Sequence, residues 1–175
     1  MEYGTFVGLS WGALFLSYVE GICYNNSLLI LLCFMLAGVA FVAPFVFATR
    51  MNKKLFLVGE KLSYWQGLLF SFSMYMYASL FCGLIVFLYF NFWDNGLLFE
   101  QMDSMVTMPE MAATYRQIGM GEQYAQMLQM MQELEELSPL EKALAVFNNN
   151  FFFSLFWSFI VAIVASYDLT KIVKK

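Results

Sequence analysis

Four apolar stretches, each about as long as a bilayer is thick, constrain this chain more than any other feature of its sequence. They cover residues 3–24, 28–48, 65–92 and 143–167. A helix of about 20 apolar residues, rising about 1.5 Å per residue, matches a hydrocarbon core about 30 Å thick. With 61% apolar and 13% charged residues, the chain is also far more apolar than a soluble protein. The sequence therefore predicts an all-α membrane protein with four transmembrane helices.

Charge and cysteine usage exclude several other classes. The net charge is −4 and no basic patch is present, which argues against a nucleic-acid partner because binding phosphates requires clustered Lys and Arg. Cys23, Cys33 and Cys82 fall within or at the ends of the apolar stretches. Their spacing fits neither a metal site nor a secreted disulfide framework, so we interpret them as small hydrophobic residues. The Met1-Glu2 start lacks the positive charge of a cleavable signal peptide, so the first stretch is expected to remain in place.

The first apolar stretch carries a small-residue stripe and one acid. Gly4, Gly8 and Gly12 repeat every four residues, which lets a second helix approach closely. Packing inside the monomer is favoured over a homodimer face, since a small bundle needs such a seam. Glu20 is the only charge near the far end of this stretch. It is either a functional ionisable group or an interfacial residue, and its position near the membrane surface favours the second interpretation.

Basic residues indicate the orientation. The segment 49–64 contains four of the nine Lys and Arg residues, and the last five residues contain three more. Short cytoplasmic loops are enriched in these residues. Four spans that start and end in the cytoplasm place seven of the nine inside and put residues 94–142 outside. In a bacterium this outer side is the periplasm.

Residues 94–142 form an acidic, methionine-rich insert within a single domain over residues 1–175. The insert holds nine of the thirteen acidic residues and eight of the thirteen methionines. Thr107 and Glu110 fit a capping box that begins a helix, and Gly119 suits its end. A second helix is predicted over 121–137, with one apolar side formed by Tyr124, Met127, Leu128, Met131, Leu134 and Leu137. We expect an acidic extramembrane helical hairpin between transmembrane helices 3 and 4.

The last span begins with the sharpest local signal in the sequence. Ser138 and Glu141 fit a second capping box with Pro139 in the first turn, so a helix should start there and continue into the membrane. Farther along this helix, Asn148, Asn149 and Asn150 follow one another. Amides at that depth usually hydrogen-bond across helices, so packing is favoured over a ligand site.

Four methionines suggest one metal hypothesis. Met102, Met105, Met108 and Met111 give three successive Met-x-x-Met spacings, and thioethers are soft ligands that select Cu(I). Pro109 restricts the backbone of Met108, so the four sulfur atoms are not expected to share one side of a helix. Methionine is also an adaptable packing residue, and packing is the favoured interpretation.

The organisation of the chain resembles domain-of-unknown-function family 4199. The resemblance covers nearly the whole chain and rests on the glycine-rich first helix and on four segments: 59–67 (GEKLSYWQG), 90–94 (FNFWD), 119–122 (GMGE) and Ser138-Pro139. The asparagine triplet and the strict Met-x-x-Met run are not features of the family.

The resemblance implies a bacterial inner-membrane protein with four spans and no established activity. Family members are similar to small membrane proteins encoded near polyprenyl-phosphate glycosyltransferases, which implies an accessory subunit for an enzyme of envelope glycan synthesis. It assigns no role to any residue of this chain.

Three functional hypotheses remain open. The leading one is a non-enzymatic scaffold or accessory subunit that contacts the lipid bilayer and binds a membrane protein or a second copy, because the sequence has no histidine and no nucleophile beside a base. The second is a lipid-active enzyme or small transporter with a polar pocket at the outer interface, built from Glu20, Asp94, Asn148, Asn149 and Asn150. The third is the Cu(I) site. No cofactor is expected.

Overall fold

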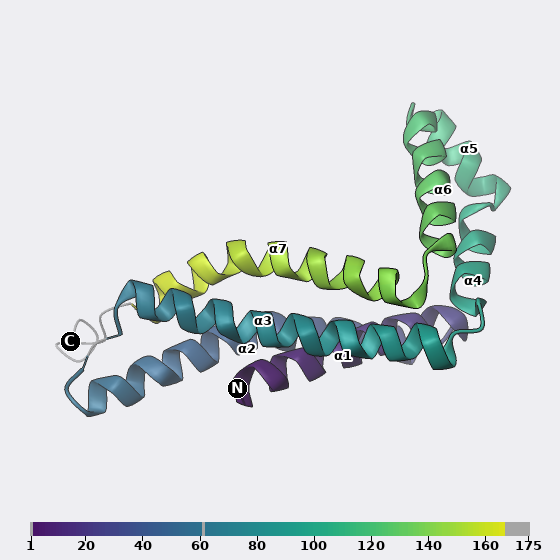
Figure 1. The fold of residues 1–175 in the computed structure, drawn as a ribbon. Helices are drawn as coiled ribbons and strands as arrows, with labels where there is room; N and C mark the ends of the chain where they lie inside the picture. Colours follow the sequence, from purple (N-terminus) through teal and green to yellow (C-terminus); the bar gives the residue numbers. More distant parts are fainter. Residues whose placement is uncertain (1, 61, 167–175) are drawn as a thin grey trace.

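The protein is all-helical over the residues that the structure, a computed structural model, describes: 2–60 and 62–166. Four helices lie side by side (Figure 1), and each is long and apolar enough to cross a membrane, as the sequence predicts. They are α1 (Glu2–Cys23), α2 (Ser27–Leu57), α3 (Tyr64–Leu88), which continues into a π-helical turn η1 (Tyr89–Trp93), and α7 (Pro139–Ala165). The predicted end of the last span at Tyr167 lies outside the described residues, as do Lys61, Lys171, Lys174 and Lys175.

Helix α3 is the central helix of this bundle. It packs against α1 and against α7, whereas α2 packs mainly against α1 and touches α7 more sparsely. In the apolar part of α3, 44% of the residues are buried, compared with 11% in α2. Helix α2 is therefore peripheral, and its apolar side chains, such as Leu28 and Phe34, lie mostly on the outer surface.

Glycines let α1 approach α3 closely. Gly4, Gly8 and Gly12 are all buried. A Cβ atom added to Gly4 or Gly8 would lie 2.7 Å from the Cβ atom of an α3 residue, and one added to Gly12 would also overlap α3; the α3 partners are Tyr77, Phe81 and Ile85, in that order. The stripe thus packs inside the monomer and leaves no room for an additional carbon atom.

A second contact of small residues joins α3 to α7. A Cβ atom on Gly67 would lie 3.6 Å from the Cα atom of Ala162. Four serines in these two helices are buried, and three of them donate to the carbonyl four residues earlier; they are Ser79, Ser154 and Ser158, with Ser71 as the fourth. These hydrogen bonds within each helix satisfy the three hydroxyl groups in an apolar interior. The small serine side chains also let the two helices approach closely.

Helix α2 is longer than the sequence analysis predicts. The segment 49–64 was expected to be a loop, but α2 continues to Leu57 and carries Arg50, Lys53 and Lys54 on its last turns. Nothing between Thr49 and Leu57 breaks a helix, and Lys and Arg are good helix formers. The helix ends where Gly59 takes a positive φ of 80° and Glu60 N–H bonds to the Leu55 carbonyl, which is a Schellman motif.

Three short helices, here called the arm, connect η1 to α7. They are α4 (Leu97–Val106), α5 (Pro109–Gln117) and α6 (Gly121–Glu136). Figure 1 shows the arm standing away from the long helices at one end of the bundle. The sequence analysis predicts only two helices here and misses α4. Its signal was present, because Leu98, Met102 and Val106 repeat every four residues.

One predicted cap in the arm is wrong. Thr107 is not an N-cap; it lies at the C-terminal end of α4, and its hydroxyl donates to the Asp103 carbonyl at 2.7 Å. Met108 takes the N-cap position of α5, without a side-chain hydrogen bond. The physical reason is that Pro109 keeps the residue before it out of the helical conformation, so α5 cannot begin earlier.

Two other predicted helix ends are confirmed. Gly119 has a positive φ of 76° and ends α5 in a Schellman motif, with Met120 N–H bonded to the Tyr115 carbonyl. Ser138 caps α7 reciprocally with Glu141, since the backbone N–H of each residue bonds to the side chain of the other. An equivalent capping box that was not predicted, formed by Ser63 and Gln66, begins α3.

Candidate functional site

Lys142 joins the arm to the bundle. Its Nζ donates to the backbone carbonyl of Glu135 at 3.0 Å, near the C-terminal end of α6. The same ammonium lies 5.0 Å from the ring centroid of Phe90 in η1 and 4.6 Å from that of Phe99 in α4. A cation is favourable both at a helix C-terminus and over aromatic rings. This one side chain therefore ties α7 to α6, η1 and α4.

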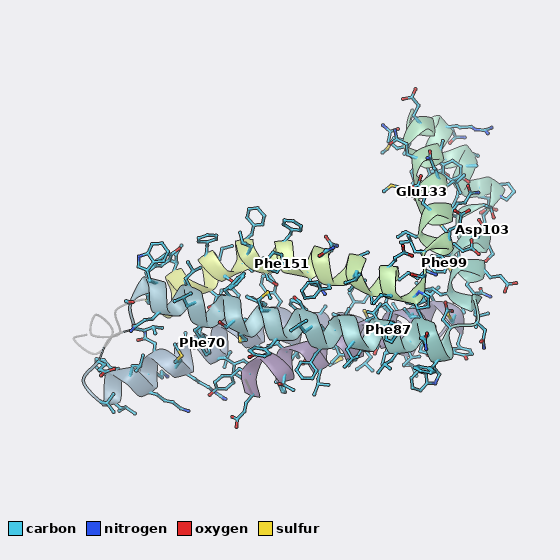
Figure 2. All side chains as sticks on the ribbon, viewed as in Figure 1. Phe70, Phe87, Phe99, Asp103, Glu133 and Phe151 are labelled. Carbon is cyan, nitrogen blue, oxygen red and sulfur yellow. The ribbon has the colours of Figure 1, made fainter. Side chains whose placement is uncertain are left out.

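An apolar cluster supports the base of the arm below this lysine. Val19 of α1, Tyr89 of η1 and Leu98 of α4 are buried together, and Phe15, Ile22, Cys23, Phe90 and Met102 pack around them. Phe99, also buried, lies at the junction of arm and bundle in Figure 2. Helix α4 is thus packed on the bundle itself, so the arm is held by more than its two chain connections.

The outer part of the arm is held by a few specific contacts. The hydroxyl of Tyr124 in α6 donates to the Val106 carbonyl at the end of α4, at 2.9 Å. The ring of Tyr124 also lies 5.4 Å from that of Tyr115 in α5. No residue of α5 or α6 is fully buried. These two helices therefore keep most of their side chains accessible to another molecule.

The accessible surface of the arm combines negative charge with exposed apolar groups. Between residues 94 and 142 stand nine acidic residues and only two basic ones, of which Lys142 is engaged at the joint. Asp103 and Glu133 lie on the arm, away from the long helices (Figure 2). Six large apolar residues of the arm are 37–61% exposed: Met108, Met111, Ile118, Met120, Met130 and Leu134.

The structure brings two of the predicted polar-pocket residues near each other. Cys23 and Tyr89 pack in one cluster at the end of α1, and the charges of Glu20 and Asp94 lie near enough to act on both. Asp94 Oδ1 also accepts from the backbone N–H of Leu98, at 3.4 Å. Glu20 and Asp94 therefore belong to the same region, at the end of the bundle that carries the arm.

The asparagine triplet does not join this region as a unit. Asn148 and Asn149 are exposed on α7, whereas Asn150 is half-buried and lines the same cavity as Cys82 of α3. Of the five predicted polar-pocket residues, Asn150 alone lines the cavity between the long helices. The five side chains are not gathered in that cavity.

This cavity, here called the lateral cavity, has a volume of about 370 Å³. All four long helices contribute to its wall, which is mainly aromatic and aliphatic; the residues with polar atoms are Trp11, Tyr18, Tyr75, Cys82, Asn150 and Trp157. Cavities of this size accommodate small ligands. The sequence analysis did not identify the cavity, because its wall comes from four separate helices.

The methionine run is divided between two helices. Met102 and Met105 lie on α4 and are partly buried, Met108 lies at the junction, and Met111 is on α5. Met102 packs in the apolar cluster at the base of the arm. Within residues 2–60 and 62–166, no three His, Cys, Asp or Glu side chains come together in a way that could hold a metal ion. The three cysteines form no disulfide.

Comparison with known proteins identifies the family. The profile of the family described as "Protein of unknown function (DUF4199)" matches residues 2–166, which is nearly the whole chain. No curated protein and no solved structure matches the sequence. The resemblance seen in the sequence motifs is confirmed: this all-helical chain with four candidate membrane-spanning helices belongs to the DUF4199 family.

Proposed function

We propose that this protein is a non-enzymatic accessory subunit of the bacterial inner membrane, and that its arm is the docking surface for a partner protein. The observation that carries the proposal is the contrast within the arm: its base is fixed by Lys142 and a buried cluster, yet α5 and α6 bury no residue. A rigidly held helical pair with free surfaces is suited to presenting side chains to another molecule.

The surface chemistry indicates the kind of partner. Exposed carboxylates attract basic residues and raise the rate of encounter. Exposed methionines adapt to differently shaped apolar side chains. A segment that carries Lys or Arg beside apolar residues complements both features, so we expect the arm to bind a basic, amphipathic part of its partner.

The proposed orientation places the arm in the periplasm and both chain ends in the cytoplasm. It is supported by the distribution of charge along the bundle, because Arg50, Lys53 and Lys54 lie on the last turns of α2, at the end opposite the acidic arm. The positive-inside rule assigns the basic end to the cytoplasm.

Labelling of single cysteines tests this orientation. In a variant without the three native cysteines, Ala113→Cys on α5 should react with a membrane-impermeant maleimide in spheroplasts, whereas Glu60→Cys should react only after lysis. Both positions are exposed, so access to each thiol depends on the compartment. The reverse pattern would refute the orientation and any periplasmic partner.

Charge neutralisation tests the docking role. Glu133→Gln combined with Glu136→Gln should reduce the amount of co-purifying partner about five-fold in low salt, because each exposed ion pair contributes about 0.5 kcal/mol. The matched control, Glu2→Gln with Glu60→Gln, removes the same charge outside the arm and should change nothing.

Quantitative mass spectrometry of the purified complex provides the measurement. The resemblance implies a polyprenyl-phosphate glycosyltransferase as the partner, and a second copy of this chain is the other outcome that the experiment separates. Equal recovery of the partner from both double variants would exclude the acidic arm as its docking surface.

A further inference from the structure

We propose that the lateral cavity holds one hydrocarbon chain of a membrane lipid. This inference concerns the four long helices and does not depend on the docking role of the arm. It starts from the position of the cavity: each of its walls belongs to a helix that is long and apolar enough to span a bilayer. Molecules that reach such a cavity from the side are those dissolved in the hydrocarbon layer.

Helices α2 and α7 both contribute to the cavity wall, and they touch each other less than α1 touches α2 or α3 touches α7. Their aromatic residues Phe41 and Phe153 line the cavity and are 51% and 50% exposed, so each reaches from the cavity wall to the outer surface. A lipid chain can therefore enter sideways, without crossing the interior of the bundle.

An aromatic contact closes one end of the cavity. The rings of Phe41 and Trp157 meet edge to face, with centroids 4.7 Å apart, and join α2 to α7. Toward the arm from this contact, the wall includes the smaller residues Ala37 of α2 and Val146 of α7, opposite the aromatic Phe15 and Tyr18 of α1. Ala37 and Val146 leave space on their side of the cavity, and the aromatic contact sets how far a chain can reach.

The size and chemistry of the cavity favour a chain over a polar ligand. About 370 Å³ lies at the lower end of ligand-binding cavities and is too small for a whole lipid. The residues that line it are mainly aromatic and aliphatic, with the amide of Asn150 among them. An unfilled cavity would forfeit dispersion contacts along its whole wall, and a lipid chain restores them.

Tryptophan fluorescence can detect the chain. Trp11 lines the cavity and is only partly exposed, so it serves as the reporter after Trp65, Trp93 and Trp157 are replaced by Phe. Phe at position 157 keeps an aromatic ring opposite Phe41. The protein is reconstituted in phosphatidylcholine vesicles with or without bromine atoms in the acyl chains, since bromine quenches tryptophan on contact. We expect strong quenching of Trp11 by the brominated chains.

Filling the cavity supplies the decisive comparison. Ala37→Phe occupies the space and should reduce the quenching of Trp11 at least two-fold. Ala145→Phe, which adds the same ring on an exposed position of α7 outside the cavity, should leave the quenching unchanged. Thermal unfolding shows whether each variant folds, and Ala40→Leu replaces Ala37→Phe if that variant does not.

Two results would overturn the proposal. One is a Trp11 that brominated chains do not quench in the parent protein, and the other is quenching that persists when the cavity is filled in a folded variant. Neither result bears on partner recovery by the arm, so failure of this inference and failure of the docking proposal are distinguishable.

Discussion

The long helices and the arm are stabilised by different kinds of contact. In the bundle, glycines and serines on α1, α3 and α7 are buried, and at the contact of α1 with α3 an added carbon would overlap a neighbour. In the arm, α5 and α6 have no fully buried residue and depend on a few identifiable contacts. The bundle is therefore sensitive to volume, whereas the arm is sensitive to particular functional groups.

The environment explains the difference. Between helices in lipid there is little hydrophobic driving force, so association depends on close packing. Helix α4 belongs to the arm but is packed like the bundle helices, because Leu98 and Phe99 are buried at its contact with them. The change from buried packing to exposed surfaces therefore occurs within the arm, between α4 and α5.

The largest expected effect is on the α1–α3 contact. Gly8→Leu should destabilise the protein by about 3 kcal/mol, because overpacking of a filled contact costs about 1–3 kcal/mol and here the neighbours include the Cα and carbonyl oxygen of Ala78. Thermal unfolding in mild detergent measures the loss. Gly38→Leu is the control, since nothing lies within 4 Å of a Cβ atom at Gly38; equal losses in the two variants would contradict the volume argument.

The second largest effect is expected at Lys142, which joins the arm to the bundle. Lys142→Met should loosen the arm by about 2 kcal/mol, since it removes one charge-assisted hydrogen bond and two cation–π contacts. Hydrogen exchange in residues 97–136 should then accelerate about 30-fold, while exchange in α3 stays the same. Lys53→Met, on an exposed position of α2, should have no such effect, and an unchanged arm in the Lys142 variant would show that the apolar cluster alone holds it.

A smaller effect distinguishes the two capping boxes that the sequence analysis predicts. Ser138→Ala should destabilise the start of α7 by about 1 kcal/mol, because it removes an N-cap oxygen. Thr107→Ala should cost less, at most about 0.5 kcal/mol, which is the low end for a hydrogen bond, because its hydroxyl only bonds back within α4. Hydrogen exchange in the first turns of α7 and α5 compares them, and a larger effect at Thr107 would restore it as a cap.

The smallest expected effect concerns the contact between α4 and α6. Tyr124→Phe removes the hydroxyl that donates to Val106 and should cost about 0.5 kcal/mol, at the low end for a hydrogen bond because the site is partly exposed. Exchange of the α6 amides provides the measurement. Tyr115→Phe keeps the pair of rings and serves as the control; if it loosens α6 as much, the hydroxyl of Tyr124 is not the specific contact.

Much of the helix plan could be predicted from the sequence because its signals are local. Span length needs only consecutive apolar residues, and the ends at Gly119 and Ser138 need only one turn of neighbouring chain. The errors arose where two local signals competed. At Thr107 a capping-box pattern overlaps the end of α4, and at Arg50 to Lys54 a polar composition suggests a loop although no residue there breaks a helix.

Residue types and spacing alone are enough to identify the four long apolar helices, the acidic segment between the third and the last, and the small-residue stripe on the first. The assembled fold is needed to see that this stripe faces α3, that Lys142 joins three other elements, and that Asn150 lines a cavity apart from Glu20 and Asp94. Composition and capping act over a few residues of chain, whereas the pairing of helix faces depends on how surfaces distant in sequence fit together in space.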